Sequence, residues 1–307
     1  MGTRIAGASA LTGSGPRNVT ARRLADAAAR ACLARAGRRP DDIDMLINTG
    51  VYREDHMGEP ALAALIQEDI KANRVEPPGG GRGTFSFDLL NGSCGVLTAV
   101  QLESGLLQSG VIGLGAIVTS DVDPGHDGSA RAGVLRPAGG AMLLSWDDDV
   151  AGFSGFHTET FPEYEGMFSS GLVWRGHGKR APRRAAGRNR MVVEERPGYQ
   201  ARLADCAEEA TRRFLDRLGM STGDIDLLVP APGSPGFLDQ LSGRLGVPGD
   251  RIAYIPENFD GVYTTGPIAA LQEAIRSDRL GEARNTLLLA AGAGITVVLA
   301  LYCQAVP

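Results

Sequence analysis

Two stretches of the chain share one order of apolar and polar positions. In the first, residues 33–37 (LARAG) precede residues 42–47 (DIDMLI). In the second, residues 215–219 (LDRLG) precede residues 224–229 (DIDLLV) with identical spacing. Each copy predicts an amphipathic helix that ends at a glycine, followed by a short turn and a buried strand.

Further matching segments extend this repeat over most of the chain. They are 95–101 (GVLTAVQ), 116–119 and 138–145 in the first half, and 266–272 (GPIAALQ), 287–290 and 292–301 in the second. Strands that alternate with helices in two matching halves predict an α/β protein with largely buried sheets. We place the division near residue 150, which gives residues 1–150 and residues 151–307. Residues 153–198 have no match in the first half, and we expect a long loop or flap there.

Composition narrows the class of protein. The 307 residues, 43% hydrophobic and 22% charged, suffice for two core-bearing units. A net charge of -5 argues against a surface adapted as a whole to nucleic acid. No apolar run reaches the roughly 18 residues of a membrane span, so we expect a cytoplasmic protein without a membrane anchor. The 4 cysteines lie far apart, and their spacing predicts neither a metal site nor a redox pair.

One segment, residues 87–95 (FDLLNGSCG), places a serine and a cysteine where a helix is expected to begin. The free N–H groups and the dipole of a helix N-terminus stabilise a thiolate and lower its pKa, so Cys94 has the chemistry of an acyl acceptor. The alternative is a small buried side chain packed beside Gly95.

Segment 87–95 resembles the nucleophile segment of the type III ketoacyl synthases, and nearly the whole chain can be laid along that family. The resemblance implies a thiolase fold, with two similar βαβα halves in a five-layer α-β-α-β-α arrangement, and a homodimer formed through the first-half sheets. It also implies acyl-CoA or acyl-carrier-protein thioesters as substrates, with no further cofactor. Counting without gaps places Ser93 at the nucleophile position. Because thiols ionise more readily than hydroxyls, we expect Cys94 to be the nucleophile and hold Ser93 in reserve.

The chain departs from the family at two positions that carry its usual chemistry. Ala231, in residues 229–235 (VPAPGSP), falls where the resemblance places a histidine. Asp260, in residues 258–267 (NFDGVYTTGP), falls where it places an asparagine. A carboxylate cannot donate as an amide does, which argues against ordinary elongation with malonyl groups. Asp260 is either a site residue or a turn residue before Gly261.

Two more site residues follow from the resemblance. Glu59 is similar to the glutamate of thiolase-fold enzymes that condense two acyl chains head to head, where it serves as a base in the partner's site. Helix capping is the alternative for Glu59, which stands directly before Pro60. The turn at 292–294 is similar to the family's oxyanion-hole segment, and this likeness assigns the backbone N–H of Ala293 to that hole.

Basic residues crowd the expected flap, where they can clamp the phosphates of coenzyme A or meet an acidic carrier protein; a solvated loop is the alternative. They are Arg175, Lys179, Arg180, Arg183 and Arg184. The histidines at 56, 126, 157 and 177 all fall in expected loops.

Two functions fit these observations. The first is an acyltransferase or condensing enzyme of lipid or polyketide-type metabolism, which forms an acyl-Cys94 intermediate while Glu59 or Asp260 handles the proton. The second is a non-catalytic ketosynthase-like subunit that forms a heterodimer with a related, active chain.

Overall fold

The structure, a computed structural model, describes residues 2–13, 19–53, 60–73, 83–122, 135–147, 151–173, 190–231 and 235–304. The first half contains β1 (Gly2–Thr12), α1 (Ala21–Ala36), β2 (Met45–Asn48), α2 (Leu62–Ile70), β3 (Phe85–Asp88), α3 (Gly95–Gln108), β4 (Leu114–Asp121) and β5 (Ala138–Asp147). The second half contains β6 (Gly152–Thr160), β7 (Phe168–Val173), β8 (Arg190–Glu195), α4 (Tyr199–Arg217), β9 (Leu227–Pro230), α5 (Pro235–Leu245), α6 (Gly266–Arg276), α7 (Arg279–Glu282), β10 (Asn285–Gly292) and β11 (Thr296–Cys303).

The strands follow the same order in the two halves. They run β1-β5-β4-β2-β3 in the first half and β6-β11-β10-β9 in the second. Next to β9, Ile252 forms a parallel bridge with Leu228, at the place that β3 has beside β2. The halves join where β1 meets β6 through the pair Thr3 and Phe153. The repeat seen in the sequence is therefore a repeat of topology.

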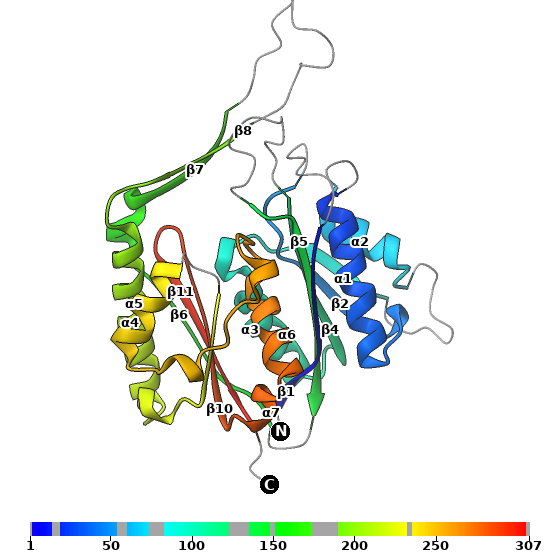
Figure 1. Cartoon of the computed structure of the whole chain (residues 1–307). Helices are drawn as coiled ribbons and strands as arrows, with labels where there is room; N and C mark the ends of the chain where they lie inside the picture. The colour runs from blue at the N-terminus through cyan, green and yellow to red at the C-terminus, as the bar shows by residue number, and fades with distance from the viewer. Residues whose placement is uncertain are drawn as a thin grey trace, which may run out of the picture.

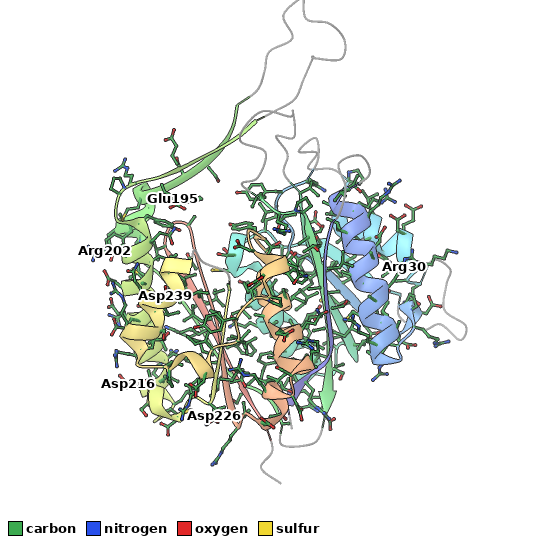
Figure 2. The ribbon with its side chains drawn as sticks, in the orientation of Figure 1. Arg30, Glu195, Arg202, Asp216, Asp226 and Asp239 are labelled. Carbon is green, nitrogen blue, oxygen red and sulfur yellow. The ribbon has the colours of Figure 1, made fainter. Side chains whose placement is uncertain are left out.

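The helices and sheets lie in five layers. The strands of both halves belong to one 9-stranded sheet. Helices α1 and α2 cover the outer face of its first half, α3 and α6 lie between the two halves, and α4 and α5 cover the outer face of its second half (Figure 1). Side chains fill the space between these layers (Figure 2). The central cluster of buried apolar side chains includes Val100 of α3, Ile268 of α6 and Ile117 of β4. The predicted five-layer arrangement is confirmed.

The helix-glycine-strand units are also confirmed. Gly37 and Gly219, which follow α1 and α4, have φ of 62° and 67°. This left-handed conformation is strained for residues with a Cβ, which is why glycine ends both helices. Strands β2 and β9 are buried throughout, as the apolar runs predict.

The flap expected at residues 153–198 is wrong in its first part. Residues 152–160 form β6, which pairs with β11 along its length and takes the place that β1 has in the first half. The sequence of this strand contains glycine and serine, which are not typical strand residues, so the strand was not predicted. Gly155 is nevertheless suited to it, because a Cβ there would lie 3.3 Å from the ring of Phe214. The hairpin of β7 and β8 has no counterpart among the described residues of the first half (Figure 1).

The division near residue 150 stays a prediction. Strand β5 ends at Asp147 and β6 begins at Gly152, on either side of it. Within the described ranges, none of the helices is long and apolar enough to cross a bilayer.

Candidate functional site

The start of α3 faces the turn between β10 and β11. A short 3-10 helix, Gly92–Cys94, leads into α3, which begins at Gly95 as predicted. The hydroxyl of Ser93 donates to the backbone oxygen of Ala291 at 2.6 Å. A Cβ added to Gly292 would lie 2.5 Å from the Ser93 Oγ. Glycine at position 292 therefore leaves the space in which this hydroxyl lies.

Cys94 lies deeper than expected, and its predicted acidity is wrong. Its side chain belongs to the central apolar cluster and is 1% exposed. Burial raises the pKa of the Cys94 thiol to about 12, although a hydrogen bond with Ser93 opposes the rise. The Sγ donates to the backbone oxygen of Thr296 at 3.4 Å, which only the protonated thiol can do. Desolvation of the thiolate outweighs the helix dipole, because the side chain points into the core.

Tyr263 reaches the same loop from the second half. Its hydroxyl oxygen would lie 2.8 Å from a Cβ added to Gly92. Its ring packs against Tyr52, with 5.3 Å between the centroids. Burial raises the pKa of the Tyr263 phenol, while a hydrogen bond with the backbone of Ser93 opposes the rise. The phenol is neutral near pH 7 and carries a proton that it can donate.

Asp121, the last residue of β4, ties together the loops that carry the two tyrosines. One carboxylate oxygen accepts from the backbone N–H groups of Val51 and Tyr52 at 3.0 and 2.8 Å. The other accepts from the N–H of Thr264 at 2.9 Å and from the Thr264 hydroxyl. Burial raises the pKa of Asp121, and these hydrogen bonds oppose the rise. A carboxylate that ends a buried strand is the sequence signal that could have revealed it.

The remaining described site residues lie apart from Cys94 in the sequence. Ala293 is exposed in the turn after Gly292, and its role as a backbone donor stays a prediction. Asp260 lies at the surface, after the 3-10 helix Glu257–Phe259, and its backbone oxygen accepts from Arg136 at 2.7 Å. Ala231 is buried after β9, and its methyl group cannot accept a proton.

Several predicted residues lie outside the described residues. They are Glu59, Arg175, Lys179, Arg180, Arg183 and Arg184, together with His56, His126 and His177. His157 is described and lies on β6, with Glu159 at 3.1 Å from its Nε2 and Arg217 at 2.7 Å from its Nδ1. These contacts hold the ring between β6 and α4, far in the fold from the start of α3.

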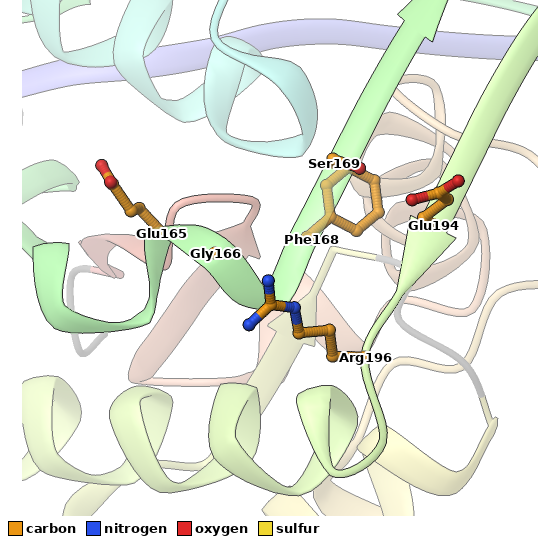
Figure 3. A pocket seen from close by; sticks show the side chains of 6 residues that line it. All are labelled: Glu165, Gly166, Phe168, Ser169, Glu194 and Arg196. Carbon is orange, nitrogen blue, oxygen red and sulfur yellow. The ribbon is translucent and has the colours of Figure 1, made fainter.

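A hollow of about 360 Å³ lies at the base of the β7–β8 hairpin (Figure 3). It is lined by Glu165, Gly166, Phe168, Ser169, Glu194 and Arg196. The Arg196 guanidinium points toward Gly166, while the two glutamates project away from it (Figure 3). Among the described residues, this hollow has one cationic side chain, Arg196, beside the carboxylates of Glu165 and Glu194.

Sequence comparisons place the chain near one group of enzymes. A profile described as the C-terminal part of 3-oxoacyl-[acyl-carrier-protein] synthase III matches residues 215–302. The beta-ketoacyl-[acyl-carrier-protein] synthase III of Listeria monocytogenes is 24% identical over 278 residues, which cover 89% of this chain and 80% of the relative. The synthase III of Symbiobacterium thermophilum is 25% identical over 287 residues, covering 87% and 78%.

Solved structures show the same fold. The 3-oxoacyl-[acyl-carrier-protein] synthase III of Aquifex aeolicus superposes with a TM-score of 0.79 at 16% identity, covering 99% of this chain and 100% of its own. OleA of Xanthomonas campestris, solved with bound lauric acid and lauroyl-CoA, gives 0.79 at 16% identity and covers 99% of both chains. The predicted thiolase fold is confirmed by these likenesses.

Proposed function

Because the chain is a type III ketoacyl synthase-like protein of the thiolase superfamily, we propose that it transfers acyl groups from CoA or acyl-carrier-protein thioesters. The reaction belongs to the condensing-enzyme type and to lipid or polyketide-type metabolism. One observation carries the proposal: the Ser93 hydroxyl lies at the start of α3 in the space that Gly292 leaves open. A side chain at position 292 would remove that space.

The acyl group is assigned to Ser93 rather than to Cys94. The Ser93 Oγ attacks the thioester carbonyl carbon, an ester bond forms, and the carbon–sulfur bond breaks. The hydroxyl proton leaves with the departing sulfur as a free thiol. Cys94 is the residue that the sequence favours, but its thiol is buried and holds its proton. Ser93 is buried as well, with 5% of the residue exposed against 1% for Cys94, so the choice of Ser93 rests on the position of its hydroxyl beside Gly292 and on the protonated thiol of Cys94.

Later steps need a group that accepts a proton, and the methyl group of Ala231 cannot do this. Glu59, contributed across a dimer, is the proposed base for a second acyl chain, and the exposed Asp260 is the alternative. The basic residues between β7 and β8 are proposed to hold the phosphates of the donor. These roles rest on the family resemblance and on the chemistry of the side chains.

Intact-protein mass spectrometry after incubation with a panel of acyl-CoAs tests the assignment. The wild type and Cys94→Ala are expected to gain one acyl mass, and Ser93→Ala is expected to gain none. Ser109→Ala, an exposed serine at the other end of α3, serves as the matched control. An adduct that survives in Ser93→Ala and disappears in Cys94→Ala would move the acyl group to the thiol.

A second candidate function is a non-catalytic subunit of a heterodimeric synthase. It is favoured by the absence of a proton acceptor at Ala231 and by the burial of Cys94. This candidate predicts that no acyl-CoA or acyl-carrier protein acylates the chain. It also predicts a stable complex with a co-expressed ketosynthase-like chain that contains the full catalytic set, and loss of the partner's activity when the complex is separated.

The edge of the first-half sheet supports pairing with a second thiolase-fold chain. Strand β3 is the last strand of that half, and Phe85 in it and Leu90 after it are each 63% exposed. An exposed apolar edge strand is suited to pair with another strand. We propose a homodimer through β3. Light scattering is expected to give a dimer mass for the wild type and a monomer mass for Phe85→Lys.

A further inference from the structure

Gly92 and Tyr263 occupy equivalent positions, three residues before the first residues of α3 and α6, and they lie against each other. Counting back from Gly95 and Gly266, which start the helices, Gly92 in the first half corresponds to Tyr263 in the second. The Tyr263 hydroxyl lies 2.8 Å from the point where a Cβ of Gly92 would be. Gly92 also has φ of 52°, a conformation that glycine adopts without strain. The glycine therefore admits the phenol to the loop that carries Ser93.

The phenol is held in this place from several sides. Asp121 accepts from the N–H of Thr264, the residue after Tyr263, at 2.9 Å. The same carboxylate accepts from the N–H of Tyr52, whose ring packs on that of Tyr263. The Thr264 hydroxyl is also within hydrogen-bond distance of Thr119. A ring fixed by its backbone and by a neighbouring ring presents its hydroxyl in one position.

The amide beneath this hydroxyl would otherwise have a catalytic use. The backbone N–H of a nucleophile at a helix start commonly stabilises the oxyanion formed from the acyl carbonyl. In this chain the Tyr263 hydroxyl lies over the residue before Ser93, and the Ser93 backbone lowers the pKa of this phenol against the effect of burial. A hydroxyl can accept one hydrogen bond and donate another, so the phenol can accept from the Ser93 N–H and donate to the acyl carbonyl oxygen.

We propose that Tyr263 is a catalytic residue whose hydroxyl donates a hydrogen bond to the acyl carbonyl oxygen during attack by Ser93, in place of the Ser93 N–H. This role rests on the proposed function of the Ser93 site. The phenol keeps its proton throughout: it accepts from the Ser93 N–H and donates to the oxygen that becomes negative in the tetrahedral intermediate. No other reactant is required.

In the alternative hypothesis, the Tyr263 hydroxyl is a plug: it blocks the Ser93 backbone N–H and so slows acylation. One substitution distinguishes the two hypotheses. Tyr263→Phe removes the hydroxyl and keeps the ring. Loss of one oxyanion donor typically lowers a rate by about 100-fold or more, so the rate of acylation by a saturating acyl-CoA is expected to fall by about 100-fold. If the hydroxyl were a plug, the same variant would acylate faster than the wild type, because the Ser93 N–H would be free.

A matched variant and a binding measurement complete the test. Tyr254→Phe alters a tyrosine that is 50% exposed and is expected to stay within about 3-fold of the wild-type rate, since it removes no donor from the oxyanion. Half-saturation by the acyl-CoA is expected to be unchanged in Tyr263→Phe.

The outcomes separate this role from the proposed function. A wild-type rate or a faster rate in Tyr263→Phe overturns the role of Tyr263 while the Ser93 function stands. A wild type that forms no adduct with any donor overturns both. Thermal unfolding of Tyr263→Phe, expected near that of the wild type, shows that a slow variant is folded.

Discussion

The starts of α3 and α6 are equivalent positions, but their hydroxyl groups have different surroundings. Counted from Gly95 and Gly266, Ser93 corresponds to Thr264, and the strand ends Gly292 and Asp121 correspond as well. Each hydroxyl meets the end of the other half's strand: Ser93 meets Ala291 beside Gly292, and Thr264 meets Asp121. The two halves thus form the same kind of contact twice, between a hydroxyl before a helix and the end of a strand of the other half. At α6 the strand ends in a carboxylate that binds the hydroxyl and makes a structural lock, while at α3 the strand ends in a glycine that leaves room for the Ser93 hydroxyl.

The contacts beneath the two helices differ in the same complementary way. In the first half Glu103 of α3 lies against Gly115 of β4, and a Cβ on this glycine would overlap the carboxyl group. The equivalent residues of the second half are Ala274 on the helix and Thr286 on the strand, and both are buried. The first half thus has a glutamate on the helix and a glycine on the strand, whereas the second half has an alanine and a threonine at these positions.

Breaking the lock at α6 is expected to have the largest effect. Asp121→Ala leaves the backbone N–H groups of Val51, Tyr52 and Thr264 without their acceptor, and an unsatisfied buried group costs about 1–3 kcal/mol. We expect the free energy of unfolding to fall by about 4 kcal/mol in a urea titration, by this reasoning. Asp216→Ala, on the exposed face of α4, is the control. A loss below about 1 kcal/mol would show that Asp121 is not the lock.

Closing the open position at α3 is expected to abolish acylation with little loss of stability. Gly292→Ala places a methyl group 2.5 Å from the Ser93 Oγ, and the hydroxyl must rotate away from Ala291. Displacement of a reacting atom by about 1 Å can cost about 100-fold in rate, while the lost hydrogen bond costs about 1 kcal/mol. Gly243→Ala, with open space around the added methyl, is the matched control for both the mass assay and unfolding. Normal acylation in Gly292→Ala would contradict the assignment of the site.

Glu103 predicts a dependence of stability on pH. Neither carboxyl oxygen makes a well-formed hydrogen bond, and burial raises the pKa well above its usual value of 4.5, with partial compensation from the Ala116 backbone. The folded state therefore keeps a proton that the unfolded state loses as pH rises above 4.5, so the wild type loses stability with increasing pH until the folded carboxyl ionises.

Glu103→Gln cannot titrate, so its stability relative to the wild type is expected to increase between pH 5 and pH 8, measured by thermal unfolding at a series of pH values. Glu273→Gln is the contrasting control. A hydrogen bond from Arg276 lowers the pKa of Glu273, so its carboxyl titrates below this window and the difference from the wild type stays flat. A flat difference for Glu103→Gln would mean that its carboxyl is already ionised in the folded protein.

The smallest expected effect is the difference in stability between variants that lack the Ser93 hydroxyl and variants that lack the Thr264 hydroxyl. Ser93→Ala removes one neutral hydrogen bond, which contributes about 1 kcal/mol. Thr264→Val removes contacts with both Asp121 and Thr119, and a bond to a charged group contributes about 1.5–3 kcal/mol. We expect Thr264→Val to be the less stable variant by about 1 kcal/mol in paired urea titrations. Equal losses would remove the distinction between a lock and an open site.

Much of the fold was predictable because its signals are local. The glycines at 37 and 219 end helices through their own backbone conformation, and the apolar runs of β2 and β9 need burial wherever they pack. Because those signals occur twice in register, they determined two matching halves. Strand β6 escaped prediction because glycine and serine are not typical strand residues, and its pairing with β11 depends on the tertiary structure.

The sequence by itself determined the place of the proposed site, since residues 87–95 and the glycine-rich turn at 292–294 carry recognisable patterns. Only the tertiary structure decided which side chains meet there. Whether Cys94 ionises depends on the apolar side chains packed around its sulfur, and the meeting of Tyr263 with Gly92 depends on the two halves facing each other. Acidity and proximity arise from contacts between residues far apart in the chain, and a local pattern does not contain them.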